Sequence, residues 1–140
     1  MPSFANNTET VIIALVLWAM VLLISLAAFR SVLNLVTGKP ANSFDPTGLD
    51  LSPFGRRLTR AHANTYEFIP FALAVMIFAV ITEQTEVTDG LAVWLLAFRI
   101  GQSSVHLIST SVIAVLIRYI IMFIPQIAIV VWWSIGLIAA

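Results

Sequence analysis

The sequence predicts an all-α integral membrane protein, a four-transmembrane-helix bundle with up-down-up-down order. Three observations support this fold class. Hydrophobic residues make up 60% of the 140 residues, charged residues make up only 10%, and the mean hydropathy is +1.00. Soluble domains usually carry about 25% charged residues. The apolar residues form four long runs, and short polar segments connect these runs. Four spans with short connections form an antiparallel bundle, so residues 1–140 are predicted to be a single membrane domain.

The four helices are predicted at about residues 11–36, 53–81, 91–108 and 112–137. The first run holds no charge from Val11 to Phe29, and at helical rise it reaches about 28 Å, enough to cross the hydrocarbon core. Gly38-Lys39-Pro40 is typical of a helix end. Ser52-Pro53 predicts the start of the second helix, because serine is a good N-cap and proline suits the first helical position.

Charge in the connecting segments predicts the orientation. The first loop region, which includes the start of the second helix, contains Lys39, Arg56 and Arg57, whereas residues 82–90 contain three acidic residues and no basic one. Cytoplasmic loops of membrane proteins carry an excess of lysine and arginine. We therefore expect a multi-pass protein with the first loop in the cytoplasm and both termini outside.

Composition excludes several classes of function. Seven basic residues balance seven acidic residues, so no net positive charge predicts a nucleic-acid partner. The absence of cysteine excludes disulfides and thiolate ligands. With two histidines and no cysteine, we predict no metal site.

Polar residues line one face of the second predicted helix. Arg60, Asn64 and Glu67 follow each other at i, i+4 and i+7, so they share that face. A carboxylate inside a bilayer costs roughly 2.5–3.5 kcal/mol on insertion scales. Glu67 therefore needs a partner or a function.

The third predicted helix carries a longer polar stripe. Its members are Arg99, Gln102, Ser103, His106 and Thr110, which fall at i, i+3, i+4, i+7 and i+11. Depth estimates from helical rise place Arg99 and Glu67 near mid-membrane, so we predict that they pair. The two stripes would then enclose a polar cleft open to the cytoplasm. Polar contacts also join membrane helices without further function, but the number of groups favours a ligand site.

The stretch Arg60-Ala-His-Ala-Asn64-Thr-Tyr-Glu67-Phe-Ile-Pro70 resembles the second-helix signature of the MAPEG family, the membrane-associated proteins in eicosanoid and glutathione metabolism. Arg99-Ile-Gly-Gln102-Ser-Ser-Val-His106 is similar to the family's second signature. These motifs cover about twenty residues, while chain length, helix number and the charged first loop extend the resemblance over most of the chain.

The resemblance implies a homotrimer that binds glutathione as co-substrate between neighbouring subunits. It implies a membrane-bound transferase or peroxidase acting on hydrophobic electrophiles, surrounded by membrane lipids. The residues implied at the glutathione site are Arg60, Asn64, Glu67, Arg99, Gln102 and His106. Arg118 is implied as the catalytic arginine that stabilises the thiolate. A guanidinium lowers the pKa of a nearby thiol, which is otherwise close to 8.5.

The sequence also departs from the family pattern. Ala63 stands where glutathione-using members often have arginine, Gln102 where some have histidine, and His106 where they often have tyrosine. These departures suggest a divergent member of bacterial type, in an inner membrane. They also leave enzymatic activity open. The alternative is a non-catalytic protein of the same fold that binds lipid or a partner subunit. A proton or ion pathway through Glu67, Arg99 and His106 is disfavoured, because four helices leave little room for a gate.

Overall fold

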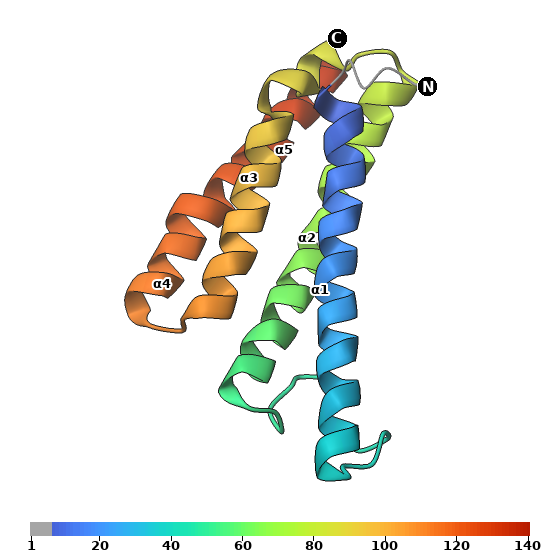
Figure 1. Cartoon of the computed structure of the whole chain (residues 1–140). Helices are drawn as coiled ribbons and strands as arrows, with labels where there is room; N and C mark the ends of the chain where they lie inside the picture. Colours follow the sequence, from blue (N-terminus) through green and yellow to red (C-terminus); the bar gives the residue numbers. More distant parts are fainter. Residues whose placement is uncertain (1–6) are drawn as a thin grey trace.

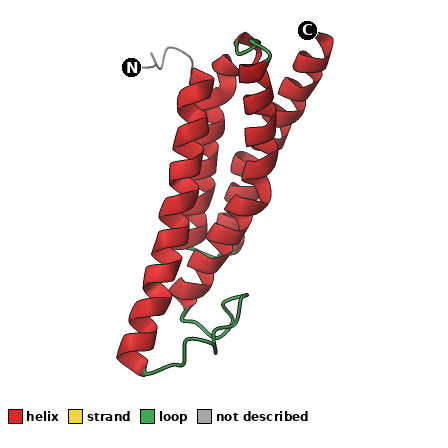
Figure 2. Cartoon of the chain, turned by 90° about the vertical axis from the view of Figure 1, so that its right-hand side faces the viewer, coloured by secondary structure: helices red, strands yellow, loops and turns green. Residues whose placement is uncertain are grey.

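The computed structural model describes residues 7–140, which form a bundle of long helices (Figure 1, Figure 2). The elements are α1 (Asn7–Thr37), α2 (Pro53–Ile81), α3 (Glu86–Ile108), α4 (Val112–Leu116), the π-helical segment η1 (Ile117–Phe123) and α5 (Ile124–Ala139). Residues 7–140 contain no strand. The predicted all-α fold class is confirmed.

Four helical segments are long and apolar enough to cross a membrane. They are α1, α2, α3 and the continuous stretch Val112–Ala139, with mean hydropathies of 2.9, 1.7, 1.4 and 2.3 in their most apolar windows. Figure 1 shows the start of α1 and the end of α5 at one end of the bundle, with the first loop (residues 38–52) and the α3–α4 turn at the other. This arrangement is the expected up-down-up-down order.

Asp89 links the first turns of α1 and α3 by hydrogen bonds. The Thr8 backbone N–H donates to Asp89 Oδ1 at 2.9 Å, and the Thr8 hydroxyl donates to the same oxygen at 2.6 Å. A carboxylate beside the first backbone N–H groups stabilises a helix N-terminus. Both helices therefore start earlier than hydropathy predicts, at Asn7 and Glu86, because their first turns are polar.

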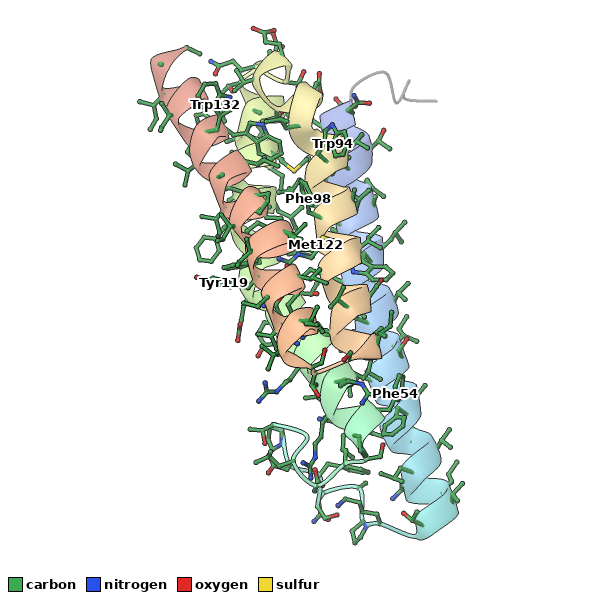
Figure 3. All side chains as sticks on the ribbon, turned by 90° about the vertical axis from the view of Figure 1, so that its left-hand side faces the viewer. Phe54, Trp94, Phe98, Tyr119, Met122 and Trp132 are labelled. Atoms are coloured by element: carbon green, nitrogen blue, oxygen red, sulfur yellow. The ribbon has the colours of Figure 1, made fainter. Side chains whose placement is uncertain are left out.

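Apolar side chains from all the long helices fill the core. Leu15 of α1, Met76 of α2, Leu95 of α3 and Trp133 of α5 are all fully buried in one cluster. A smaller cluster around Leu22, Leu26, Leu58 and Ala61 lies toward the first loop. Figure 3 shows Trp94 and Trp132 near the end of the bundle that carries the termini, and both are exposed. Exposed tryptophans at a bundle end are typical of a membrane interface.

The first loop docks closely on α2. Ser52 Oγ accepts a hydrogen bond from the Gly55 backbone N–H at 3.2 Å, which makes it the N-cap that the sequence predicts. Gly48 has φ +75°, and a Cβ there would lie 2.7 Å from Thr59 Oγ1. Glycine is required at this position both by its conformation and by the close approach to α2.

The last span differs from the single helix predicted at about 112–137. A π-helical segment interrupts it, and the Ile124 N–H bonds to the Tyr119 carbonyl five residues earlier. Pro125 follows directly, and its missing N–H cannot serve the Ile121 carbonyl four residues before it. Proline alone does not explain the π segment, because α2 continues as an α-helix through Pro70.

Candidate functional site

Arg99 is the centre of a buried polar network at the middle of the bundle. Its side chain is 0% exposed, and its guanidinium carbon lies 4.5 Å from the centre of the Phe68 ring. Arg99 Nε donates to Gln126 Oε1 at 2.8 Å, and Nη1 donates to Asn64 Oδ1 at 2.9 Å. The network thus joins α2, α3 and α5 through one cation.

Gln126 extends the network to a second residue of the predicted stripe. Its Nε2 donates to Gln102 Oε1 at 2.9 Å and to the Met122 carbonyl at 2.7 Å. Gln126 is 0% exposed and Gln102 is 3% exposed. Sequence reasoning missed Gln126, although a lone amide in the apolar run from residue 119 to 133 is a signal that could have identified it.

Ser103 connects the same region to α1. The Trp18 indole donates to Ser103 Oγ at 3.1 Å, and the Thr65 hydroxyl lies 3.2 Å from it. Ser103 in turn donates to the Arg99 carbonyl at 3.0 Å. Thr110, by contrast, lies beyond the end of α3 and is exposed. The first four members of the α3 stripe are therefore buried, and the last is not.

A cluster of positive charge lies nearer the end of the bundle that holds the α3–α4 turn. Arg118 Nη1 lies 3.1 Å from His106 Nδ1. Arginine has donors only, so Nδ1 accepts this bond and the His106 proton is placed on Nε2. The charges of Arg60, Arg99 and Arg118 all act on the His106 ring. Among residues 7–140, none of these three arginines forms an ion pair with a carboxylate.

The π segment helps to bring Arg118 and Gln126 to the same side. In a regular α-helix, residues eight positions apart lie about 80° apart around the axis. Each π turn includes one additional residue, which turns the later side chains back. As a result, Arg118 reaches His106 and Gln126 reaches Arg99, both on α3. Gly101 allows the close approach, because a Cβ there would lie 3.1 Å from Met122 Sδ.

The predicted pair between Glu67 and Arg99 is wrong. Within the described part of the chain, the ion pair that forms joins Lys39 to Asp50, and Glu67 is exposed on α2. Phe68 and Ile69 pack into the core instead, which turns Glu67 outward. Arg60 is also exposed, so Asn64 is the residue of the α2 stripe that contacts Arg99.

Positive charge from Arg60 on α2, Arg99 on α3 and Arg118 on η1 acts on His106, and none of these arginines has an acidic partner among the described residues. No group of three or more histidine, cysteine, aspartate or glutamate side chains within residues 7–140 is arranged to hold a metal ion.

Comparison with known protein families assigns the chain. The model of the MAPEG family matches residues 8–138, nearly the whole chain. The comparisons with curated proteins and with solved structures gave no match. The family match spans all four membrane-crossing segments and every residue of the site. The chain therefore belongs to the MAPEG family.

Proposed function

We propose that this protein is a trimeric membrane enzyme that uses glutathione as a thiolate against hydrophobic electrophiles, as a transferase or peroxidase. Family membership supports a role of the glutathione and eicosanoid kind. The observation that carries the proposal further is the cluster of Arg60, Arg99 and Arg118, which has no carboxylate partner among residues 7–140. Glutathione has two carboxylates and an ionisable thiol, and these groups complement positively charged side chains.

Each group has a role in this proposal. Asn64 and Arg99 shape the floor of the site, with Gln102 fixed through Gln126. The His106 Nε2–H hydrogen-bonds the tripeptide, and Glu67 and Arg60 contribute from the exposed face of α2. Arg118 holds the thiolate, because a guanidinium favours the charged form of the sulfur. The thiolate then attacks the electrophile, forming a carbon–sulfur bond while the leaving group departs.

The trimer is supported by the position of Glu67. An exposed carboxylate on a membrane-spanning helix is costly against lipid. A neighbouring protomer that covers this face of α2 would remove that cost, and it would place the site between subunits.

The test is calorimetric titration of the detergent-purified protein with reduced glutathione, followed by a turnover assay with 1-chloro-2,4-dinitrobenzene. We expect binding in the wild type and its loss in Arg118→Ala and Arg99→Ala. Arg57→Ala is the matched control, because Arg57 bonds the Leu107 carbonyl and lies outside the network. Absence of binding at millimolar glutathione would contradict the proposal.

A second candidate is a non-catalytic protein that binds lipid or a partner subunit. It is favoured by Ala63 in place of a family arginine, and by the bonds that Arg99 and Arg118 already make within the chain. The double variant Ala63→Arg and His106→Tyr separates the two. Activity that appears only in this variant would indicate a decayed enzyme.

A further inference from the structure

An apolar groove of about 410 Å³ lies where α1 meets the beginning of α2 and the end of α3. One side of α1, from Trp18 to Val32, forms its longest wall. Phe54 and Leu58 line it from α2, and Leu107 lines it from α3. Figure 3 shows Phe54 at the beginning of α2, beside α1. The groove therefore lies near the end of the bundle that carries the first loop.

The few polar groups in the lining of the groove are already bonded within the chain. The Ser25 hydroxyl donates to the Val21 carbonyl at 2.6 Å, and the Trp18 indole donates to Ser103 Oγ at 3.1 Å. The remaining lining side chains are apolar. The wall of the groove thus offers apolar contacts, which an aliphatic chain satisfies without leaving a polar group unpaired.

The groove lies within the depth of the hydrocarbon core. Its α1 residues other than Val32 belong to the charge-free run Val11–Phe29. The distance from Trp18 to Phe29 is about 16 Å at helical rise, close to half of the ~30 Å hydrocarbon core. Phe29 packs against Phe54, with ring centres 5.9 Å apart. The groove therefore follows α1 through about one leaflet of the bilayer.

Arg57 lies at the rim of the groove. Its guanidinium carbon is 5.9 Å from the centre of the Phe54 ring, and its Nε donates to the Leu107 carbonyl at 2.8 Å. Phe54 and Leu107 both line the groove, so the charge lies between two of its walls. Arg57 forms no ion pair within residues 7–140. Its two Nη groups make no hydrogen bond in that part of the chain and are not buried, so an acceptor from outside the chain can reach them.

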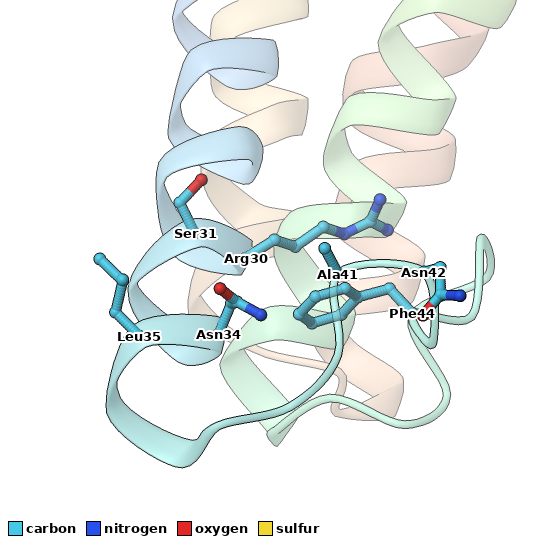
Figure 4. Close-up of a pocket in the computed structure, with 7 residues that line it drawn as sticks. All are labelled: Arg30, Ser31, Asn34, Leu35, Ala41, Asn42 and Phe44. Carbon is cyan, nitrogen blue, oxygen red and sulfur yellow. The ribbon is translucent and has the colours of Figure 1, made fainter.

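A second pocket, of about 520 Å³, lies between the last turns of α1 and the first loop (Figure 4). Arg30, Asn34 and Asn42 line it, together with the Phe44 ring. Its α1 residues follow Phe29, so this pocket lies outside the apolar run of the helix. Of the two pockets, the groove is the one that combines an apolar lining with a position inside the hydrocarbon core.

We propose that the groove binds one acyl chain of an anionic phospholipid, whose phosphate lies at Arg57. The chain packs along α1 between Phe29 and Trp18, and the Arg57 Nη groups donate to the phosphate oxygens. Arginine suits this role because its planar fork of donors matches phosphate oxygens. The positive-inside rule predicts that this end of the bundle is cytoplasmic, and the cytoplasmic leaflet is rich in anionic lipids. The proposal is independent of the proposed function, since none of these residues is assigned a contact with glutathione.

Native mass spectrometry tests the proposal, with the purified protein incubated with equal amounts of phosphatidylglycerol and phosphatidylcholine that carry the same acyl chains. We expect the wild type to retain phosphatidylglycerol preferentially. Arg57→Gln should reduce that preference about tenfold, as expected for the loss of a charge-assisted contact. Arg56→Gln is the matched control and should keep the preference, because the Arg56 guanidinium bonds the Leu49 and Leu51 carbonyls of the first loop.

Ala28→Phe tests the position of the acyl chain in the same experiment. Ala28 lines the groove and is exposed, so a phenyl ring at this position fills the groove without entering the core. This variant should retain less of both lipids. Ala27→Phe is the matched control and should retain both, because Ala27 is exposed on α1 but does not line the groove.

Equal retention of the two lipids by the wild type, or retention that neither Arg57→Gln nor Ala28→Phe lowers, would overturn the proposal. A loss in Ala28→Phe alone would assign the groove to an uncharged apolar ligand, and a loss in Arg57→Gln alone would place the acyl chain elsewhere. A shift of Ala28→Phe from oligomer to monomer, with no lipid retained by the wild type, would assign the groove to a neighbouring protomer. Each of these results would also overturn the lipid assignment.

Discussion

Arg118 and His106 define the most testable contact at the scale of single residues. If Arg118 stabilises a bound thiolate, its removal raises the pKa of that thiol, because the guanidinium favours the charged form. The rate depends on the thiolate, so the acidic limb of the pH–rate profile should move toward pH 8.5, the ordinary pKa of a thiol.

We therefore expect Arg118→Gln to lower kcat on the order of 10²-fold at neutral pH, with part of the activity regained as the pH rises. The measurement is the initial rate of conjugation from pH 6 to pH 9.5, compared with Arg57→Gln. A uniform loss of rate with an unchanged pH profile would mean that Arg118 does not act on the thiol.

Gln126 accepts a hydrogen bond from Arg99 through its neutral amide oxygen. Two substitutions separate the role of this contact in ligand binding from its role in packing. Gln126→Leu removes the partner of both Arg99 Nε and Gln102, and should cost roughly 1–2 kcal/mol of stability. Gln126→Glu instead places a carboxylate beside the guanidinium and neutralises the charge of Arg99, although it loses the two bonds that Gln126 Nε2 donates to Gln102 and to the Met122 carbonyl.

Thermal unfolding together with glutathione titration distinguishes these effects. We expect Gln126→Glu to unfold no earlier than Gln126→Leu, because its ion pair with Arg99 offsets the lost bonds, but to bind glutathione about tenfold more weakly than the wild type. If it binds glutathione as tightly as the wild type, Arg99 serves the fold and its charge is not used by the ligand.

At the scale of elements, the π segment determines which side chains of the last span meet α3. It begins at Ile117 and ends at Phe123, just before Pro125. π turns within α-helices are frequent at functional sites. Here the segment allows Arg118 and Gln126 to contact His106 and Arg99 at the same time.

Pro125→Ala restores the missing N–H and favours a regular α-helix through this region. We expect equal or higher thermal stability, with glutathione affinity several-fold lower because Arg118 turns away from His106. Pro70→Ala in α2, where no π segment precedes the proline, is the control for proline removal. Unchanged binding in both variants would show that the π segment does not position Arg118.

At the scale of the whole molecule, the periodicity and hydropathy of the sequence were sufficient to predict the helical bundle and the face of α3 that is buried. The stripe of α3 is buried at four of its positions: Arg99, Gln102, Ser103 and His106. Polar residues at helical spacing share one face of the helix, and this face packs against the other helices. The position of Glu67 was predicted wrongly because the neighbouring apolar residues Phe68 and Ile69 pack into the core, which leaves Glu67 on the outer face of α2.

The contribution of Gln126 could not be predicted from the periodicity of one segment. Its direction depends on the π segment, and a π segment depends on how the last span packs against Gly101 and its neighbours on α3. Such a change of register is a property of two helices together. The sequence therefore predicted the buried polar residues of α3, which is a regular helix, but not the residue that the irregular last span brings to them.

The exposed carboxylate of Glu67 leads to the prediction for the assembled protein. In a lone subunit facing lipid, Glu67→Leu would remove a cost of roughly 2.5–3.5 kcal/mol and stabilise the protein. In a trimer that covers this face of α2, the same change removes a polar contact between protomers and weakens the assembly. We expect the second outcome, seen in native mass spectrometry as a shift from trimer to monomer at equal protein concentration. Glu86→Gln, in the exposed first turn of α3, should leave the distribution unchanged. A more stable monomer in Glu67→Leu, without any trimer in the wild type, would contradict a site shared between subunits.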